Sequence, residues 1–403
     1  MHRVAITGLG CVSALGLDVA ANWQSLAAGR PGLGDISLVP PESLNIRLVG
    51  EVKGFDPQRY FDDRQNAMLD RFSQLVVVAA REAVKDAGLT LPGEAPRRVA
   101  VVTGIGLGGV ITMDEGYHRL YARNMQRNHP LTIPRLMPSA SASQISMDLG
   151  ITGPAFSVTS ACASSNHALG EAFWMVRSGR VDVALSGGSE APLSYGSMRA
   201  WEALRVLATD ACRPFSKERR GMVLGEGGGI VVLENWERAK ARGAHIYAEF
   251  VGFGMSADAG DIVQPSAEGA AAAMTDALED AGLAPEQVGY INAHGTGTQI
   301  NDLVETRAIR AAFGPLAEKI AVSSTKSMHG HALGGAGALE MVALVKAVEQ
   351  GLLPPTANFL TPDPACDLDY VPNEARRREV EVGLSNSFAF GGLNAVVAVK
   401  RAA

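Results

Sequence analysis

The sequence has few charged residues, no long apolar run and only four cysteines, and each shortage excludes a class of protein. Charged residues make up 19% of the 403 positions, the net charge is −6, and lysine and arginine form no block of more than a few residues. This balance offers no basic groove for nucleic acid and no basic patch for a membrane surface. We therefore expect small molecules or proteins as partners, not nucleic acid or a membrane.

No apolar stretch is long enough to span a bilayer. The most apolar helical stretch, Leu75–Ala80, is followed at once by Arg81 and Glu82. The first ten residues, MHRVAITGLG, hold an apolar run too short for a signal peptide. We expect a soluble cytoplasmic protein.

The four cysteines, Cys11, Cys162, Cys212 and Cys366, are scattered and form no CxxC pair. No histidine stands at the spacing that a zinc site would need, so no metal site is expected. A disulfide framework is not expected in a chain of this length, so each cysteine is interpreted as a free thiol.

Short β-rich runs alternate with longer helical patterns along nearly the whole chain, which predicts an α/β protein. The expected strands are Val4–Thr7, Val99–Thr103, Phe156–Thr159, Val181–Leu185, Ile230–Leu233, Tyr247–Gly252, Gly289–Ala293, Ile320–Ser323, Val380–Leu384 and Ala395–Val399. The clearest helical patterns are Phe72–Ala87, Ala168–Arg177, Ala270–Ala281 and Ala336–Gln350. These helices are amphipathic or apolar throughout, as expected of helices that cover a sheet or lie between sheets.

A charged segment between two strand runs, Glu234–Gly243, is the one candidate boundary inside the chain. It predicts two parts, residues 1–243 and residues 244–403. A glycine-containing strand opens each part, RVAITGLG in the first and YAEFVGFG in the second. We interpret this similarity as an internal duplication.

The segment FSVTSACASSNHALGEAF predicts a strand, a turn of small residues and then a helix that begins near Cys162. A thiol at a helix start lies beside free N–H groups and the positive end of the helix dipole, which stabilise a thiolate or an oxyanion. A buried structural cysteine is the commoner interpretation of a cysteine taken alone.

Two further clusters follow predicted strands and contain histidine. YINAHGTGT carries His294 in a loop of small residues, and VSSTKSMHGH carries Lys326, His329 and His331 before a glycine-rich helix start. One such histidine is ordinarily a core or surface residue. Two at separate strand ends favour a shared site, because ligands of α/β folds bind at the carboxyl ends of strands.

A last cluster, LSNSFAFGGLN, places Phe388 and Phe390 beside two glycines just before the final strand. The two aromatic rings fit a turn with core side chains. They equally fit a mobile apolar gate whose backbone N–H group serves as an oxyanion donor.

With these clusters in this order, the chain resembles the elongating β-ketoacyl-ACP synthases of the thiolase superfamily, of the Cys-His-His, ketosynthase II-like type. The resemblance runs through VAITGLGCVSALG, TSACASS, CRPFSKERRGMVLGEGGG, NAHGTGT, STKSMHGH, DYVPNEAR and NSFAFGG, and so covers nearly the whole chain. It implies the thiolase fold, with two βαβαβαββ halves in a five-layered α-β-α-β-α arrangement. A homodimer is the usual assembly, and a heterodimer with a related subunit is an alternative.

The resemblance also implies the chemistry. Cys162 takes an acyl chain from acyl-ACP, and the chain is extended by decarboxylative Claisen condensation with malonyl-ACP in fatty-acid or polyketide and polyene biosynthesis. No metal or organic cofactor is implied. The implied roles are decarboxylation for His294 and His331, a supporting charged pair for Lys326 and Glu340, pantetheine contacts for Thr296 and Thr298, oxyanion amides for Cys162 and Phe390, and a gate for Phe388, Phe390 and Gly391.

The chain departs from the family pattern at several places. The usual GFGGTN reads AFGGLN, so Ala389 replaces a glycine and Leu393 a threonine, and His329 stands where threonine is common. The helix preceding Phe72 reads RQNAML and holds only Arg64 as a basic residue for an acidic carrier protein. We expect either weaker docking of a fatty-acid carrier protein or docking through Arg71, Arg123, Arg127, Arg205 or other basic residues.

Other functions fit less well. The GIGLGG stretch at 104–109 follows a strand but lacks the acidic residue of a dinucleotide site, and GEGGG at 225–229 lacks the lysine of a P-loop. A thiolase would carry a second cysteine in the final loop, where this chain reads NSFAFGG. A non-catalytic subunit resembling a chain-length factor would lack Cys162.

Overall fold

One mixed sheet of ten strands runs through the computed structural model, which describes residues 1–93 and 95–402. Each strand overlaps one of the ten predicted runs. The strands are β1 (Val4–Ser13), β4 (Val99–Gly104), β5 (Ala155–Val158), β6 (Val183–Glu190), β7 (Gly227–Asn235), β8 (Ala248–Ala257), β9 (Val288–Asn292), β10 (Ala321–Ser323), β13 (Val382–Ala389) and β14 (Leu393–Arg401).

The two halves of the sheet repeat one topology. Across the sheet the order is β5-β4-β6-β7-β1 and then β8-β14-β13-β9-β10. If the five strands of each half are numbered in chain order, their order in space from the outer edge to the middle of the sheet is 3-2-4-5-1 in both halves. In both halves the second strand pairs in parallel with the third and fourth, and the remaining pairs are antiparallel. The internal duplication interpreted from the sequence is therefore confirmed.

Among the described residues, the half-sheets pair with each other where β1 meets β8, over Val4–Ile6. Beyond that point the free amides of Leu9 and Cys11 donate to Asp86 and Glu82, at 2.9 Å each. Because these carboxylates accept hydrogen bonds from backbone amides that β8 no longer pairs with, the half-sheets can diverge and leave room for helices between them.

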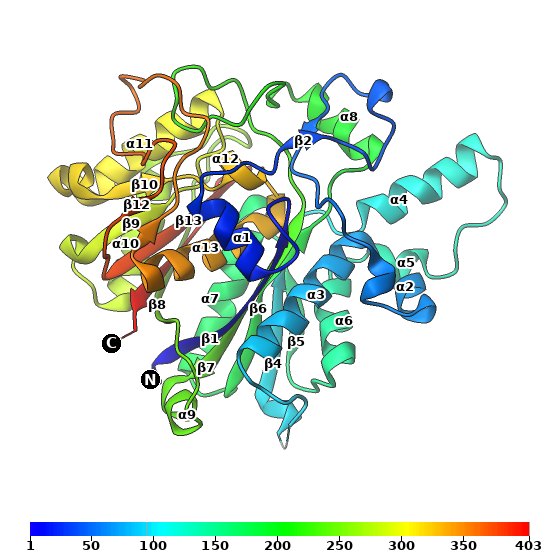
Figure 1. The fold of residues 1–403 in the computed structure, drawn as a ribbon, viewed down its shortest axis with the longest axis horizontal. Helices are drawn as coiled ribbons and strands as arrows, with labels where there is room; N and C mark the ends of the chain where they lie inside the picture. The colour runs from blue at the N-terminus through cyan, green and yellow to red at the C-terminus, as the bar shows by residue number, and fades with distance from the viewer. Residues whose placement is uncertain (94, 403) are drawn as a thin grey trace.

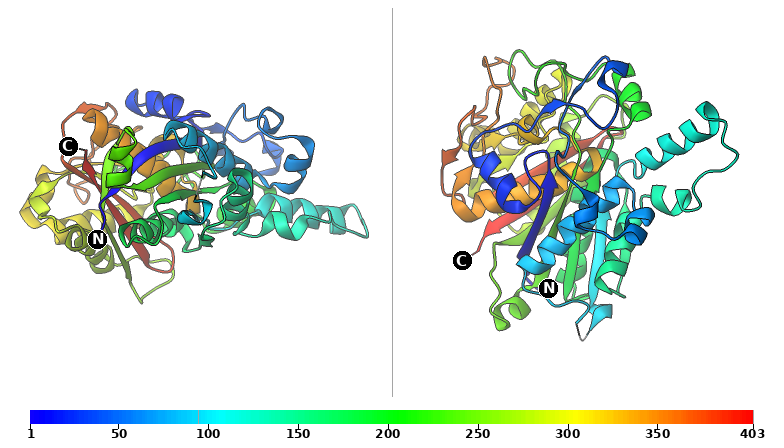
Figure 2. Two further views of the ribbon diagram at one scale, coloured as in Figure 1. Left: turned by 90° about the horizontal axis from the view of Figure 1, so that it is seen from below. Right: turned by 45° about the vertical axis from the view of Figure 1, so that its right-hand side comes forward.

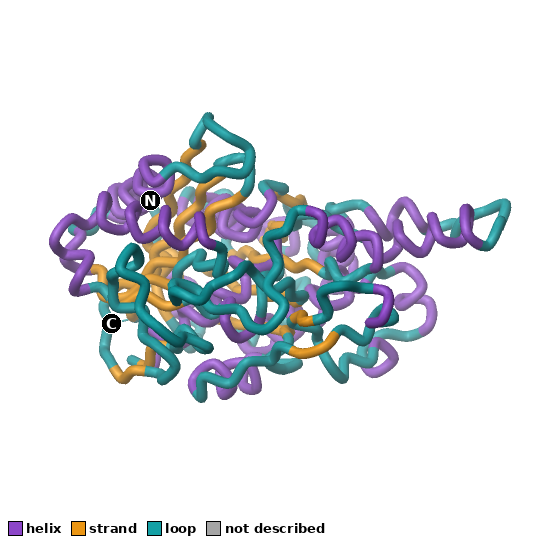
Figure 3. Tube along the Cα trace, turned by 90° about the horizontal axis from the view of Figure 1, so that it is seen from above, coloured by secondary structure: helices purple, strands orange, loops and turns teal. Residues whose placement is uncertain are grey.

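Helices complete five layers, whose members are labelled in Figure 1, and Figure 3 shows how helices and strands are distributed over the body. On the outer face of the first half-sheet lie α3 (Arg71–Asp86) and α6 (Ala140–Leu149), and on the second lie α10 (Ala267–Ala281) and α11 (Gln299–Phe313). The central layer holds α7 (Ser164–Arg177) and α13 (Ala336–Gln350), which contact strands of both halves. The predicted α-β-α-β-α arrangement of the thiolase fold is confirmed.

Glycine makes the close strand and helix contacts possible in both halves. A Cβ atom at Gly10 would come within 1.9 Å of the carbonyl oxygen of Ala79 in α3. A Cβ atom at Gly254 would come within 2.2 Å of the carbonyl oxygen of Ala273 in α10. The glycine-containing strands that open the two halves are thus explained by the same packing requirement.

The remaining elements are short and lie mostly in connections. The helices are α1 (Val19–Ala27), α2 (Asp63–Met68), α4 (Val110–Tyr117), α5 (Thr132–Leu136), α8 (Tyr195–Ala203), α9 (Trp236–Ala241) and α12 (Lys326–His329). Short 3-10 helices are η1 (Pro41–Ser43), η2 (Pro57–Arg59), η3 (Pro96–Arg98), η5 (Ala161–Ala163), η6 (Pro285–Gln287), η7 (Gly314–Lys319) and η8 (Leu333–Gly335), and η4 (His118–Ala122) is a short π-helix. Two small sheets pair β2 (Gly34–Asp35) with β3 (Leu48–Val49), and β11 (Leu352–Leu353) with β12 (Arg376–Arg377).

The segment from α4 to α5 projects from one end of the body (Figures 1 and 2). It exposes several large apolar side chains, among them Tyr117, Tyr121 and Ile133. Within the described part of the chain, no helix has both the length and the apolar character that a membrane crossing requires.

Candidate active site

Cys162 lies in a tight turn between β5 and α7. The turn η5 begins with Ala161, whose φ of 49° is rare for a residue with a side chain, and α7 starts at Ser164. The thiol is 7% exposed. The predicted strand, turn and helix are therefore present, with Cys162 just before the first turn of α7.

His294 follows β9 and precedes α11, and its main chain is held by a buried carboxylate. Glu305 in α11 accepts hydrogen bonds from the amide of His294 at 2.8 Å and from that of Gly295 at 2.7 Å. Gly295 and Gly297 adopt positive φ values of 37° and 80°. The sequence analysis missed Glu305, because no local pattern distinguishes it from the other acidic residues of that helix.

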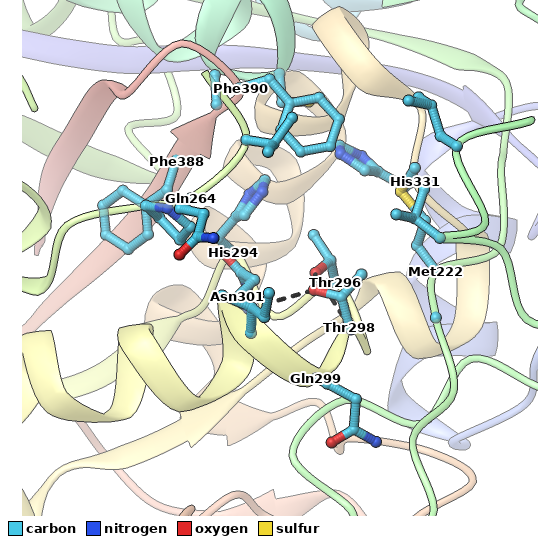
Figure 4. A pocket seen from close by; sticks show the side chains of 18 of the residues that line it. Met222, Gln264, His294, Thr296, Thr298, Gln299, Asn301, His331, Phe388 and Phe390 are labelled. Atoms are coloured by element: carbon cyan, nitrogen blue, oxygen red, sulfur yellow. Dashed lines mark hydrogen bonds between the residues drawn. The ribbon is translucent and has the colours of Figure 1, made fainter. Parts of the chain in front are cut away.

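His331 follows β10 and α12 and comes from the same half of the fold. Its amide donates to the carbonyl oxygen of Val223 at 2.7 Å. The rings of His294 and His331 are 5.4 Å apart and nearly perpendicular, and they turn toward the same space (Figure 4). The structure thus brings the two predicted histidines together.

Lys326 links His294 to a buried acid. Its ammonium group forms an ion pair with Glu340, neither side chain is exposed, and it also donates to Nδ1 of His294 at 3.4 Å. Because Nδ1 accepts this bond, the ring hydrogen of His294 lies on Nε2.

Both catalytic candidates among the histidines are neutral. Burial, the Lys326 charge and the neighbouring His331 hold the pKa of His294 well below its usual range. Burial, Lys326 and His329 do the same for the pKa of His331. Two neutral imidazoles can donate hydrogen bonds but do not bring a permanent charge into the site.

The thiol of Cys162 differs from the sequence expectation of a stabilised thiolate. Burial raises the pKa of Cys162 to about 12, although the Lys326 charge acts in the opposite direction. Burial thus outweighs the helix start, because a charged sulfur in an apolar site loses its hydration. The resting side chain is a thiol, and its proton must leave as acyl transfer proceeds.

The predicted gate is the hairpin between β13 and β14. Phe388 is buried, whereas Phe390 is 39% exposed and its ring stacks on Trp201 with centroids 6.3 Å apart. Gly391 and Gly392 carry the turn with φ values of 84° and 69°, and the amide of Gly391 donates to the carbonyl of Ile262 at 2.8 Å.

Ala389, which replaces a family glycine, lies at the end of β13 and pairs with Leu393 across the hairpin. Its φ is not positive in this state, so the alanine fits here without strain. The turn itself depends on the two glycines that follow.

Cys162, His294 and His331 line one cavity of about 450 Å³. Its lining draws on both halves of the fold and includes Cys162, Trp201, Arg205, Arg220, Met222, Gln264, His294, Thr296, Thr298, His331, Phe388 and Phe390. The hydroxyl oxygens of Thr296 and Thr298 are 2.9 Å apart (Figure 4). Lys326 and Glu340 lie behind the histidines and do not line the cavity.

Two further residues from the sequence analysis have structural roles. His329 is buried, with Nδ1 2.7 Å from the carbonyl oxygen of Gly330 and Nε2 3.0 Å from the hydroxyl of Thr325. Arg71 forms an ion pair with the fully buried Glu226 at 2.6 Å. The expectation that Arg71 helps to dock a carrier protein is wrong, because its guanidinium is already engaged inside the fold.

Comparison with known proteins places the chain in a family. Residues 1–239 match the family model described as "Beta-ketoacyl synthase, N-terminal domain", and residues 247–360 match "Beta-ketoacyl synthase, C-terminal domain". Nodulation protein E of Rhizobium sp. (strain N33) is 49% identical over 99% of both chains. The 3-oxoacyl-[acyl-carrier-protein] synthase 2 of Staphylococcus aureus (strain N315) is 42% identical over 99% of this chain and 98% of that protein.

Solved structures agree. A structure of the ishigamide ketosynthase/chain length factor matches with a TM-score of 0.96 and 36% identity over the full length of both chains. A type II PKS acyl-carrier protein in complex with its ketosynthase bound to the hexaketide matches with a TM-score of 0.90 and 33% identity, again over the full length of both. The chain is therefore a member of the β-ketoacyl synthase family with the thiolase fold, an acyltransferase that forms the carbon–carbon bond of a β-ketoacyl thioester.

Proposed function

We propose that Cys162 is the nucleophile of this synthase and that His294 and His331 stabilise the charge formed when malonyl-ACP loses carbon dioxide. One observation carries the proposal. Three side chains from three separate strand ends converge on one cavity, and both imidazoles are buried and neutral.

In the first step, the Cys162 sulfur attacks the thioester carbonyl of acyl-ACP. The acyl group moves to the sulfur, and the thiol proton leaves with the pantetheine thiol of the carrier protein. The oxyanion would bind to the amides of Cys162 and Phe390. Neither amide donates a hydrogen bond to any residue within 1–93 and 95–402, which supports this assignment.

In the second step, the bond between the malonyl carboxylate and its methylene carbon breaks. Carbon dioxide leaves, and the electron pair moves to the thioester oxygen to form an enolate. Hydrogen bonds from neutral His294 and His331 favour that oxyanion over the uncharged carbonyl. The enolate carbon then attacks the acyl group, and the Cys162 sulfur leaves as a thiolate that takes up a proton from water to restore the resting thiol.

Lys326 acts through His294, which makes it a positioning residue. Its hydrogen bond to Nδ1 keeps the hydrogen on Nε2, which is the nitrogen available to the thioester oxygen. Glu340 compensates the charge of Lys326 where no water reaches.

We propose acyl-ACP and malonyl-ACP as the partners, with the pantetheine arm passing Thr296 and Thr298, which line the cavity. Arg123, Arg127 and Arg205 are exposed and form no ion pair in the described residues, which supports them as contacts for an acidic carrier protein.

We also propose a dimer, either of two copies or with a related subunit. The apolar side chains exposed on the α4 to α5 segment support such an interface.

We propose residues 1–243 and 244–403 as the two halves, supported by the family-model matches that end at 239 and begin at 247. Four unpaired cysteines fit a reducing cytoplasm as the place of action.

Intact-mass analysis after incubation with a panel of acyl-ACPs tests the nucleophile and reports the preferred chain. Peptide mapping should find the acyl group on Cys162. Acylation of Cys11, Cys212 or Cys366 with an unmodified Cys162 would contradict the proposal.

Malonyl-ACP decarboxylation separates the roles of the remaining groups. Cys162→Gln should abolish condensation yet retain decarboxylation, because both histidines remain. His294→Ala or His331→Ala should each raise the activation barrier for decarboxylation by about 2.7–4 kcal/mol, the loss typical of one oxyanion donor. Unchanged decarboxylation in both histidine variants would show that the assignment is wrong.

A further inference from the structure

The glycine-rich stretch GIGLGG, which begins at the last residue of β4, already binds a carboxyl group, and that group belongs to the chain itself. The carboxylate of Glu190, the last residue of β6, accepts hydrogen bonds from the amides of Gly106 at 2.7 Å, Leu107 at 3.1 Å and Gly108 at 3.0 Å. Glu190 has no exposed surface. The loop is therefore closed to a phosphate, and its amides serve an internal purpose.

The same carboxylate reaches across to the other half of the fold. It accepts a fourth amide, that of Gly334 in η8, at 3.2 Å. The carbonyl oxygen of Gly334 accepts a hydrogen bond from the hydroxyl of Ser165 in α7. Side chains of the first half thus bind the Gly334 residue at both its amide and its carbonyl.

The contact has no room for a larger residue. A Cβ atom at Gly334 would lie 2.1 Å from the amide nitrogen of Gly106, and one at Gly106 would lie 2.6 Å from the Glu190 carboxylate. Both distances are far below a normal contact, so the turn η8 and the loop after β4 hold a single relative position.

The turn η8 is the counterpart of the turn that carries Cys162. Each is a three-residue helical turn that begins with a positive φ, 49° at Ala161 and 44° at Leu333, and each leads directly into a central helix, α7 or α13. In this alignment Gly334 corresponds to Cys162. Glu190 therefore binds the amide that corresponds to the proposed oxyanion amide of Cys162.

We propose that Glu190 is a positioning residue for the condensation: with Ser165, it fixes the turn that follows His331 against the turn that carries Cys162. His331 stands three positions before Gly334, and Cys162 stands three positions before Ser165. The two catalytic groups come from different halves, and this pair of contacts joins their turns. The inference rests on the proposed roles of Cys162 and His331.

The test measures malonyl-ACP decarboxylation in a Cys162→Gln background, and alkylation of Cys162 by iodoacetamide in the parent background. Glu190→Gln keeps the side-chain size but turns an N–H group toward the amide donors. We expect kcat for decarboxylation to fall about 10- to 100-fold, as for a catalytic group displaced by up to 1 Å, with KM for malonyl-ACP unchanged. Ser165→Ala should give a smaller loss of the same kind, about 2- to 10-fold.

Glu82→Gln is the matched control. Its carboxylate also accepts two backbone amides, from Cys11 at 2.9 Å and Val19 at 2.8 Å, but it lies outside the cavity. This variant should retain decarboxylation, and alkylation of Cys162 should be unchanged in all three variants. If Glu190→Gln does not fold, Ser165→Ala decides the question.

A parent-like kcat in folded Glu190→Gln and Ser165→Ala would overturn the inference. So would an equal loss in Glu82→Gln, since that result would reflect general destabilisation. His331→Ala, measured in the same assay, distinguishes failure of the proposed function from failure of the positioning role alone. If it retains decarboxylation, the proposed function fails; if it loses decarboxylation while the Glu190 and Ser165 variants do not, only the positioning role fails.

Discussion

Replacing Lys326 with methionine keeps the length of the side chain and removes its charge from a position without exposed surface. Its partner Glu340 is equally buried, so the carboxylate would lose its compensating charge and gain no water. Removing one member of a buried ion pair costs about 3–5 kcal/mol. The entropy of unfolding for a chain of 403 residues is about 0.85 kcal/mol per degree, so the melting temperature should fall by about 4–6 °C.

The second substitution tests this reasoning. Glu340→Gln in the Lys326→Met background removes the uncompensated charge, so the double variant should recover most of the lost stability in thermal denaturation. An equal fall in melting temperature for the single and double variants would refute the electrostatic explanation. The loss would then come from packing around the lysine side chain.

The pH dependence gives an independent check. Burial raises the pKa of Glu340 even in the presence of the lysine, and loss of Lys326 should raise it further. A carboxyl group whose folded pKa lies above its unfolded value, 4.5 for Glu340, destabilises the fold at higher pH and has no such effect below that value. The stability that Lys326→Met loses relative to the parent protein should therefore become smaller as the pH falls from 8 to 5. The stability difference between the double variant and the parent should stay constant over this range.

Three more predictions concern the gate, the thiol and the carrier protein. Ala389→Gly with Leu393→Thr should restore a flexible hinge and broaden the range of acyl chains loaded from acyl-ACP, and an unchanged chain profile by intact mass would place selectivity elsewhere. Because the pKa of Cys162 is raised to about 12, its alkylation should accelerate about tenfold per pH unit between pH 6.5 and 8.5, and a plateau below pH 8 would contradict this. Arg205→Glu should raise the apparent KM for acyl-ACP more at low salt than at high salt. Arg71→Met should instead lower thermal stability. A KM effect in Arg71→Met with none in Arg205→Glu would refute the docking assignment.

The sequence predicts the sheet well because burial on both faces leaves a strong local pattern. The runs Val99–Thr103 and Ile230–Leu233, for example, are apolar and lie inside β4 and β7. The clusters around His294 and His331 likewise follow strands, so their meeting at one edge of the fold could be expected from topology alone.

What the sequence does not predict depends on partners far apart in the chain. Glu190 meets Gly334 across 144 positions, and Arg71 meets Glu226 across 155. No local pattern distinguishes these charged residues from solvated ones. The protonation of Cys162 was missed for a related reason, since a helix start is visible in the sequence but the extent of burial around the thiol is not.

The matching turns before α7 and α13 also bear on how such an enzyme could evolve. Two identical copies of an ancestral half would present the same residue at both turns, on either side of an approximate twofold axis. Here one turn presents the thiol of Cys162, and the other presents Gly334, whose amide is bound by a carboxylate. Because both halves belong to one chain, the two turns can carry different residues, and a single nucleophile can share its site with two imidazoles from the other half.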